Sequence, residues 1–216
     1  MLRASKLVMA LVGMLLASIA FGQHPGSTAD DPRTEANIRE LVRRGAVVKR
    51  FAVLESETVG LLVRLKPDHL SRSGTINPEI VRFLRPLPEL TVELRGLSLS
   101  DDGLKELLDS APLAGLDVSG SQVTNGGLMP FESERSRLRL LDLSFTRVDD
   151  DGLTSLAALS ELRHLSLIGC RGVTDQGLES VSRCKRLREL YLAQTPVGSA
   201  AVATLRRSLP HCRIER

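Results

Sequence analysis

The sequence of 216 residues has no tryptophan, one tyrosine and five phenylalanines. Large rings therefore cannot dominate the core, and leucine, valine and alanine must fill most of it. Such a composition suits an array of short, similar layers better than a globular core built around aromatic side chains.

The sequence also lacks the short motifs that mark common active sites. It contains no G-x-S-x-G, no phosphate-binding loop and no H-E-x-x-H. None of the four histidines has a nucleophile or an acid at a recognisable spacing. A hydrolase that uses His164 is the weakest hypothesis, and the sequence predicts a protein that is not an enzyme and binds no cofactor or metal.

Cysteine is scarce, with three residues at positions 170, 184 and 212. Burial as a free thiol is the common outcome for such cysteines. In an exported protein one disulfide could form, with Cys184–Cys212 the best of the available pairs, and the odd count leaves at least one thiol free. His211 and Cys212 together supply two ligands, too few for a zinc site.

Only one long apolar run occurs, near the N-terminus. Arg3 and Lys6 flank its start, it extends from Leu7 to Phe21, and small residues precede Gln23. This pattern predicts a secretory signal over residues 1–22, cleaved before Gln23. The alternative is an uncleaved anchor, although about 15 residues span only ~22 Å of a ~30 Å hydrocarbon core. We expect a secreted, periplasmic or cell-envelope protein, without stable membrane insertion after cleavage.

A large excess of charge of one sign is missing too. Without Arg3 and Lys6, the formal net charge falls from +3 to +1, which argues against a dedicated nucleic-acid-binding protein. Charge is unevenly spread, with an acidic stretch over 101–117 and a basic stretch over 183–216. Solvated helix faces explain most such patterns.

What the sequence has in abundance is one repeated phrase. V-x-x-x-G-L occurs at 123–128, 148–153 and 173–178, a copy that begins with leucine lies at 99–104, and a worn copy lies at 197–202. The closing apolar residues are 24 or 25 positions apart. A constant period in this range predicts a solenoid of stacked repeats.

A second phrase, L-x-x-L-x-L, precedes each copy of the first. It begins at Leu113, Leu138, Leu162 and Leu187, with a last copy at Leu209. Its closing L-x-L has a period of two, which is typical of a strand with one buried face. In the segment after V-x-x-x-G-L, apolar residues recur every three positions, as over 153–159, so each repeat is predicted to be strand, turn and helix.

The chain ahead of the repeats divides into smaller parts. Residues 23–33 are polar and contain two prolines, which predicts a disordered linker. Residues 34–75 contain a helical stretch and two β-prone runs that could pair as a hairpin across 55–57, and we expect them to cap the solenoid. Residues 76–216 hold the repeats, from a degenerate copy at 76–81 to a terminal strand near Ile214.

Together these phrases resemble the leucine-rich repeat, in the cysteine-containing, ribonuclease-inhibitor-like subtype of about 24–26 residues. The stretch 165–178, with Cys170, fits the subtype best, and Cys184 matches it too. The resemblance covers about 76–214 and implies an α/β leucine-rich repeat solenoid, with a parallel sheet on the concave side and helices on the convex side. The family includes F-box substrate receptors and bacterial exported proteins. No F-box precedes these repeats, so a ubiquitin-ligase role does not carry over.

Structural roles explain the constant letters of V-x-x-x-G-L. Its Thr, Asn, Asp and Ser side chains can accept hydrogen bonds from free N–H groups at a helix start, and its glycine lets the helix approach the neighbouring coil. The acidic triplet at 149–151 looks like a cation site. Helix capping explains it without a ligand, and calcium needs a wider spread of oxygen ligands.

The variable positions of the strands are therefore the candidates for binding, because outward residues of successive parallel strands share the concave face. We expect a strip that is acidic early and aromatic to basic late; the alternative is that its polar residues only satisfy local backbone. The candidate residues are Asp117, Asp142, His164, Ser166, Glu189, Tyr191 and Arg213. Tyr191 is the strongest, because an exposed ring on a rigid sheet is a typical anchor.

These observations predict non-catalytic binding of a protein or peptide outside the cytoplasm. The alternative is a structural or scaffolding module that self-associates or docks within a larger envelope assembly.

Overall fold

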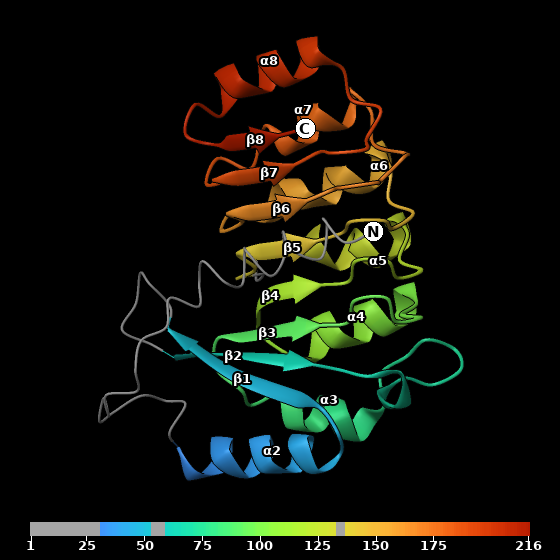
Figure 1. The fold of residues 1–216 in the computed structure, drawn as a ribbon, viewed down its shortest axis with the longest axis vertical. Helices are drawn as coiled ribbons and strands as arrows, with labels where there is room; N and C mark the ends of the chain where they lie inside the picture. The colour runs from blue at the N-terminus through green and yellow to red at the C-terminus, as the bar shows by residue number, and fades with distance from the viewer. Residues whose placement is uncertain (1–30, 53–58, 133–136) are drawn as a thin grey trace.

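The computed structural model of the protein describes residues 31–52, 59–132 and 137–216. The expected signal segment 1–22, most of the expected linker and the turn expected at 55–57 lie outside the described residues. Within the described residues, eight strands form one sheet in chain order, and from β3 onward strands and helices alternate (Figure 1).

The strands are short, and every pair except the first is parallel. β1 (Val47–Ala52) and β2 (Val59–Arg64) pair antiparallel, as the two β-prone runs predict. The parallel strands that follow are β3 (Leu90–Glu93), β4 (Leu113–Asp117), β5 (Leu140–Asp142), β6 (His164–Ser166), β7 (Glu189–Tyr191) and β8 (Arg213–Glu215).

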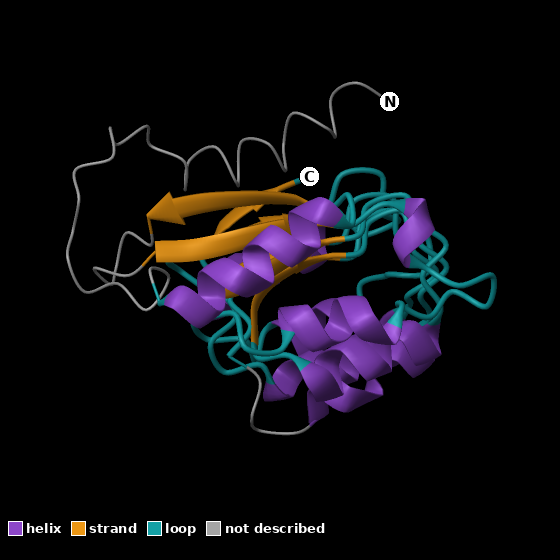
Figure 2. Ribbon diagram, turned by 90° about the horizontal axis from the view of Figure 1, so that it is seen from below, coloured by secondary structure: helices purple, strands orange, loops and turns teal. Residues whose placement is uncertain are grey.

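The helices of the repeats lie on one side of this sheet (Figure 2). They are α3 (Pro78–Leu84), α4 (Asp101–Ser110), α5 (Asn125–Leu128), α6 (Asp150–Leu153), α7 (Gly177–Val181) and α8 (Ser199–Ser208). The architecture is the predicted solenoid of strand–turn–helix units with a sheet on one side and helices on the other.

In the middle repeats a tighter helix replaces part of the α-helix. After α6 the chain continues as a 3₁₀ helix over Thr154–Ala158, and a 3₁₀ helix over Met129–Glu132 follows α5. The leucines at 153, 156 and 159 are all buried. Their spacing of three matches the three residues per turn of a 3₁₀ helix, which keeps all of them on the core side.

Leucines from successive strands form the core between the two layers. Leu116, Leu141, Leu165 and Leu190 lie opposite one another in the parallel register, and each is at most 1% exposed. The valines that open the V-x-x-x-G-L phrase are buried in the same cluster. Each repeat thus buries its apolar face against its neighbours, as stacked repeats require.

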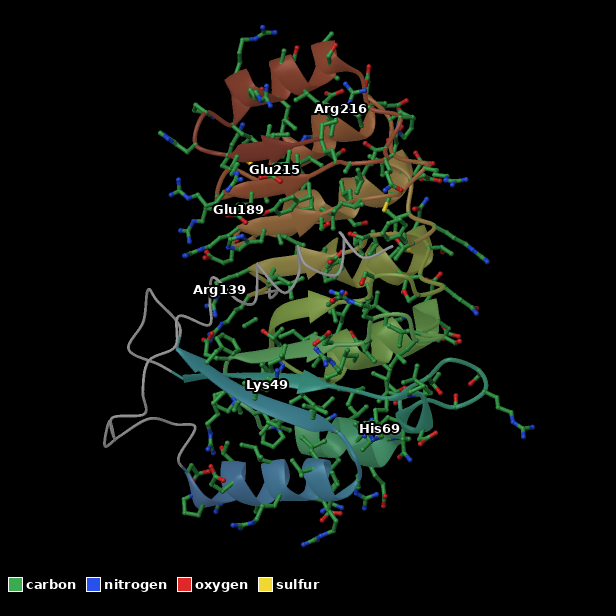
Figure 3. The ribbon with its side chains drawn as sticks, in the orientation of Figure 1. Lys49, His69, Arg139, Glu189, Glu215 and Arg216 are labelled. Atoms are coloured by element: carbon green, nitrogen blue, oxygen red, sulfur yellow. The ribbon has the colours of Figure 1, made fainter. Side chains whose placement is uncertain are left out.

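At the N-terminal end, α2 (Pro32–Arg43) packs beside α3 and β1. It starts two residues earlier than expected, because Pro32 suits the first turn and the Asp31 side chain accepts a hydrogen bond from the Thr34 N–H. Buried His69 joins two segments here (Figure 3): its Nδ1 accepts from the Lys66 N–H, and its Nε2 lies 2.9 Å from the Arg44 carbonyl oxygen, to which it donates.

Candidate binding surface

The parallel register gathers the candidate residues into two columns on the sheet. The central column, formed by the final residues of β3 to β8, contains Glu93, Asp117, Asp142, Ser166, Tyr191 and Glu215. The leading column, two positions earlier, contains Thr91, Gly115, Leu140, His164, Glu189 and Arg213. All seven candidates fall in these columns, on the strand face opposite the leucine core.

The last strand differs from the expected alignment by two residues. Arg213 lies opposite Glu189 in the leading column, and Glu215, not Arg213, lies opposite Tyr191. The expectation was wrong because Leu209 ends α8, where its N–H bonds the Leu205 carbonyl, and does not open a strand phrase. Consequently Cys212 precedes β8 and does not occupy an inward strand position.

Tyr191 is not the exposed ring that the sequence predicts, since only 8% of it is exposed. The ring packs against Ile168 and Ala193, and its hydroxyl donates to Glu189 Oε2 at 3.0 Å. Burial and the Glu189 carboxylate raise the pKa of the Tyr191 phenol. The side chain therefore belongs to the framework of the surface more than to its contact area.

Asp117 and Asp142 are also buried, and half of each carboxylate has a local backbone role. Asp117 Oδ1 accepts from the Ser119 N–H at 2.9 Å, and Asp142 Oδ1 accepts from the Ser144 N–H at 2.8 Å. These bonds turn the chain at the strand ends. For this half of each carboxylate, the observed bonds are to the local backbone, as the alternative interpretation of the column expects.

The other oxygen differs between the two residues. Asp117 Oδ2 accepts from the Arg95 guanidinium at 2.9 Å. Asp142 Oδ2 is buried and has no hydrogen-bond partner among the described residues. Burial, and then the neighbouring Asp117 charge, raise the pKa of the Asp142 carboxyl to about 7. Asp142 is thus the carboxylate of the surface whose charged form is least stabilised by its surroundings.

Other carboxylates in the columns already have basic side chains as neighbours. Glu93 pairs with Arg64 at 2.9 Å, Glu189 with His164 at 3.1 Å, and Glu215 with Arg213 at 2.5 Å. The early part of the strip is therefore not a free acidic surface.

The accessible part of the columns lies late in the sheet, where Figure 3 labels Glu189 and Glu215. Arg213 is exposed, whereas His164 and Glu189 are half-buried. Because Ser166 is buried between Asp142 and Tyr191, direct contact with a partner would fall first on the leading column.

A third column, the turn column, lies at the turns that follow the strands, and none of the seven candidates belongs to it. From β3 to β7, each central-column residue is followed by one inward apolar residue, and the residue two positions after that has a positive φ. The five residues are Gly96, Gly120, Phe145, Gly169 and Gln194. Glycine suits this left-handed conformation, whereas a bulky side chain is strained in it. Phe145, with φ of 57° and 47% exposure, is therefore an outlier. The sequence signal was available, as an aromatic residue in a column of glycines.

The V-x-x-x-G-L phrase forms a hydrogen-bonded ladder between repeats. The third residue of one copy accepts from the backbone N–H of the second residue in the next copy, at 2.5–3.0 Å. The pairs are Asp101 with Thr124, Asn125 with Asp149, Asp150 with Thr174, and Asp175 with Gly198. The sequence predicted caps within each repeat. Such caps exist at α4, α5 and α6, whereas α8 begins after Gly198 without a side-chain cap. The sequence missed the bonds between repeats.

The glycine of the phrase makes room for this ladder. A Cβ on Gly152 would lie 2.3 Å from Asn125 Oδ1, and one on Gly177 would lie 2.3 Å from Asp150 Oδ1. For the first full repeat the Gly74 carbonyl replaces the side-chain acceptor, taking the Ser100 N–H at 3.0 Å and lying over Gly103. These contacts assign the acidic triplet at 149–151 a structural role.

The three cysteines are free thiols in this structure. Cys170 and Cys184 are buried, as predicted, and Cys170 Sγ donates to the Leu143 carbonyl at 3.0 Å. Burial raises the pKa of Cys170, and it raises the pKa of Cys184 to about 11. Burial and then Glu189 raise the pKa of half-buried Cys212 to about 11 as well. Such thiols are poor nucleophiles at neutral pH.

Within the described ranges, no group of three or more His, Cys, Asp or Glu side chains is placed to hold a metal ion. No helix in the same ranges is long and apolar enough to cross a membrane. What the surface offers is a rigid sheet with half-exposed charged and hydrogen-bonding side chains, which is the chemistry of recognition.

Comparison with known proteins agrees with this geometry. A family model described as Leucine Rich repeat matches residues 138–157, which include β5 and α6. No curated protein sequence matches the chain.

Two solved structures are similar in part. A leucine-rich repeat protein of Leptospira interrogans is 20% identical with a TM-score of 0.42, over 66% of this chain and 34% of that one. The chain thus spans about a third of the length of that protein. The leucine-rich repeat ectodomain of the receptor kinase SOBIR1 from Arabidopsis thaliana is 18% identical with a TM-score of 0.27, over 88% of this chain and 91% of that one.

Proposed function

We propose that the protein, a leucine-rich repeat solenoid, binds a protein or peptide on the concave face of its sheet. The proposed binding involves no catalysis and takes place outside the cytoplasm. One observation carries the proposal: the register brings seven variable, mostly polar positions into two adjacent columns on a face that is not needed for the leucine core. Repeats stack to build extended surfaces of this kind.

The burial of the central column refines where a partner would touch. Its side chains support the surface, whereas Arg213 is exposed and His164 and Glu189 are partly exposed. We expect the partner to contact these residues of β6, β7 and β8. Their mixed charge favours a partner with both acidic and basic groups.

Site-specific photocrosslinking tests this proposal. A benzophenone amino acid at Arg213 should crosslink to a protein in the native organism, because that side chain projects from the concave side of β8. The same amino acid at Lys105, exposed on α4 of the convex layer, is the control. Crosslinks from Lys105 and none from Arg213 would contradict a concave binding face.

Export rests on the segment 1–22, and it is tested separately. The proposed signal predicts a mature N-terminus at Gln23, which intact-mass measurement of the purified native protein would reveal. A protein that retains its first 22 residues would support the anchored alternative instead.

A scaffolding role has one observation in its favour. Among the described strands, β1 and β8 each pair on one side only, and unpaired strand edges can recruit another chain. Sedimentation of the purified protein would support this second role if it shows oligomers that substitutions in β8 dissociate.

A further inference from the structure

Comparison of the five turn-column residues shows what the backbone requires at this position and which residues depart from that requirement. Three of its five residues are glycine, and all five have φ between 57° and 69°. Consecutive turns are joined by backbone bonds, as between the Phe145 N–H and the Ile168 carbonyl at 2.7 Å. The turn therefore needs glycine-like backbone geometry and no large side chain.

Phe145 does not fit this requirement, because its side chain is a large aromatic ring. The residue is 47% exposed, and its ring lies over Gly169, where a Cβ would come within 2.4 Å of the ring. The next repeat thus leaves space for one face of the ring, while much of the rest meets solvent. An exposed aromatic side chain kept on a strained backbone is a sign of function, and aromatic side chains are typical anchors of interfaces.

Two arginines follow the turns at Phe145 and Gly169, in segments that a bridge between Asp149 and Gly172 places side by side. Arg147 lies two residues after Phe145, and Arg171 lies two residues after Gly169. Both are exposed, and neither guanidinium group has a hydrogen-bond or ion-pair partner among the described residues. The corresponding positions of the other repeats hold Ser98, Gln122 and Pro196. The aromatic ring and the unpaired cations thus occur together, in the same two repeats.

We infer that Phe145, Arg147 and Arg171 form a docking patch for an acidic protein segment that carries an apolar side chain. The apolar side chain packs on the open part of the Phe145 ring, and the carboxylates pair with the two guanidinium groups. Arginine favours carboxylate partners because its planar fork can donate two parallel hydrogen bonds. The inference rests on the proposed function and adds the chemistry of the partner and a second contact area, at the edge where the strands end.

A random peptide library displayed on phage tests the patch without knowledge of the natural partner. Peptides selected on the purified protein should contain Asp or Glu next to Leu, Ile, Phe or Trp. Synthetic peptides of the enriched sequence should bind Phe145→Gly at least about tenfold more weakly, and Arg147→Ser/Arg171→Ser likewise. Their affinity for the unmodified protein should also fall with rising salt.

The variants are chosen so that loss of folding does not mimic loss of binding. Phe145→Gly introduces the residue that three other repeats have at this position, so its melting temperature should not fall appreciably. Gln194→Gly makes the same backbone change two repeats away, and Met129→Ala removes another exposed apolar side chain. Both controls should bind the peptides normally.

Several outcomes would overturn the patch. They are a library that yields no enriched peptide, enriched peptides without acidic residues, and peptides that bind Phe145→Gly as well as the unmodified protein. If Arg213→Glu abolishes binding while Phe145→Gly does not, the patch fails and the concave surface stands. Dissociation of a dimer of the free protein by Phe145→Gly would identify a second copy as the occupant and would also overturn the inference.

Discussion

At the scale of single residues, repetition gives most side chains several counterparts in the same backbone position. Asp117 and Asp142 both turn the chain with Oδ1, but only Asp117 has a guanidinium at Oδ2. Phe145 occupies a turn position that is glycine in three of the other four repeats. Such departures are informative, because the neighbouring repeats show what the shared backbone requires at the same position.

Asp142 should make stability depend on pH in a defined direction. Its folded pKa of about 7 lies above the ordinary 3.8, so between pH 4 and 7 the folded state binds more protons than the unfolded one. The contribution of this group to stability is therefore lost as pH rises through that range. The charged groups that act on it are Asp117 of the preceding repeat and Arg95, which follows β3 two strands away.

Asp142→Asn removes the charge and retains an acceptor for the Ser144 N–H. We expect it to exceed the unmodified protein in unfolding free energy at pH 8 by up to about 4 kcal/mol, with a difference that shrinks towards pH 4. Urea unfolding at several pH values measures this, and exposed Asp151→Asn is the control. A difference that does not change with pH would contradict the assignment.

At the scale of elements, the ladder of the V-x-x-x-G-L phrase couples each helix start to the next. The side chain at the third position and the glycine at the fifth belong together, although they come from different repeats. The sequence indicated a cap and a close approach. It could not indicate that one oxygen accounts for both, because the pairing depends on how far adjacent coils are offset.

A double-mutant cycle tests the coupling. Asn125→Ala removes the acceptor of the Asp149 N–H and should cost about 1–2 kcal/mol of unfolding free energy, while Gly152→Ala should cost more, because its Cβ would meet Asn125 Oδ1. Combined, the two should cost less than their sum by about 1 kcal/mol or more, since removal of Asn125 clears the space. Additive losses in chemical unfolding would show that the glycine serves another contact.

At the scale of the whole molecule, the period predicted the order and parallel pairing of the repeat strands. Alternation also predicted that all seven candidate residues share the strand face opposite the leucine core. It did not predict that Tyr191 and Asp142 are buried. A period of two predicts which face of the strand a side chain occupies, and not how far the neighbouring side chains cover it. The predicted alignment of β8 was wrong, because α8 continues to Ser208 and the strand begins later than the last L-x-x-L-x-L phrase predicts.

The two ends of a solenoid have one neighbour each, so their stability should depend on few contacts. At the N-terminal end α2 contributes Leu41, which is fully buried in the core cluster, and His69 bonds the chain just after this helix. We propose that α2 and the β1–β2 hairpin act as the cap that shields β3 and the first repeat. If so, damage to this end should spread only a short distance along the stack.

Leu41→Ala tests this one-dimensional behaviour. It should destabilise the cap by about 2–4 kcal/mol and speed amide hydrogen exchange in α2, β1 and β2, while exchange in β6 to β8 stays unchanged. Val42→Ala truncates the adjacent side chain, which is 52% exposed, and should leave exchange unaltered throughout. Faster exchange along all eight strands would mean that the protein unfolds as one cooperative unit, since a local cap would confine the effect to the repeats that it touches.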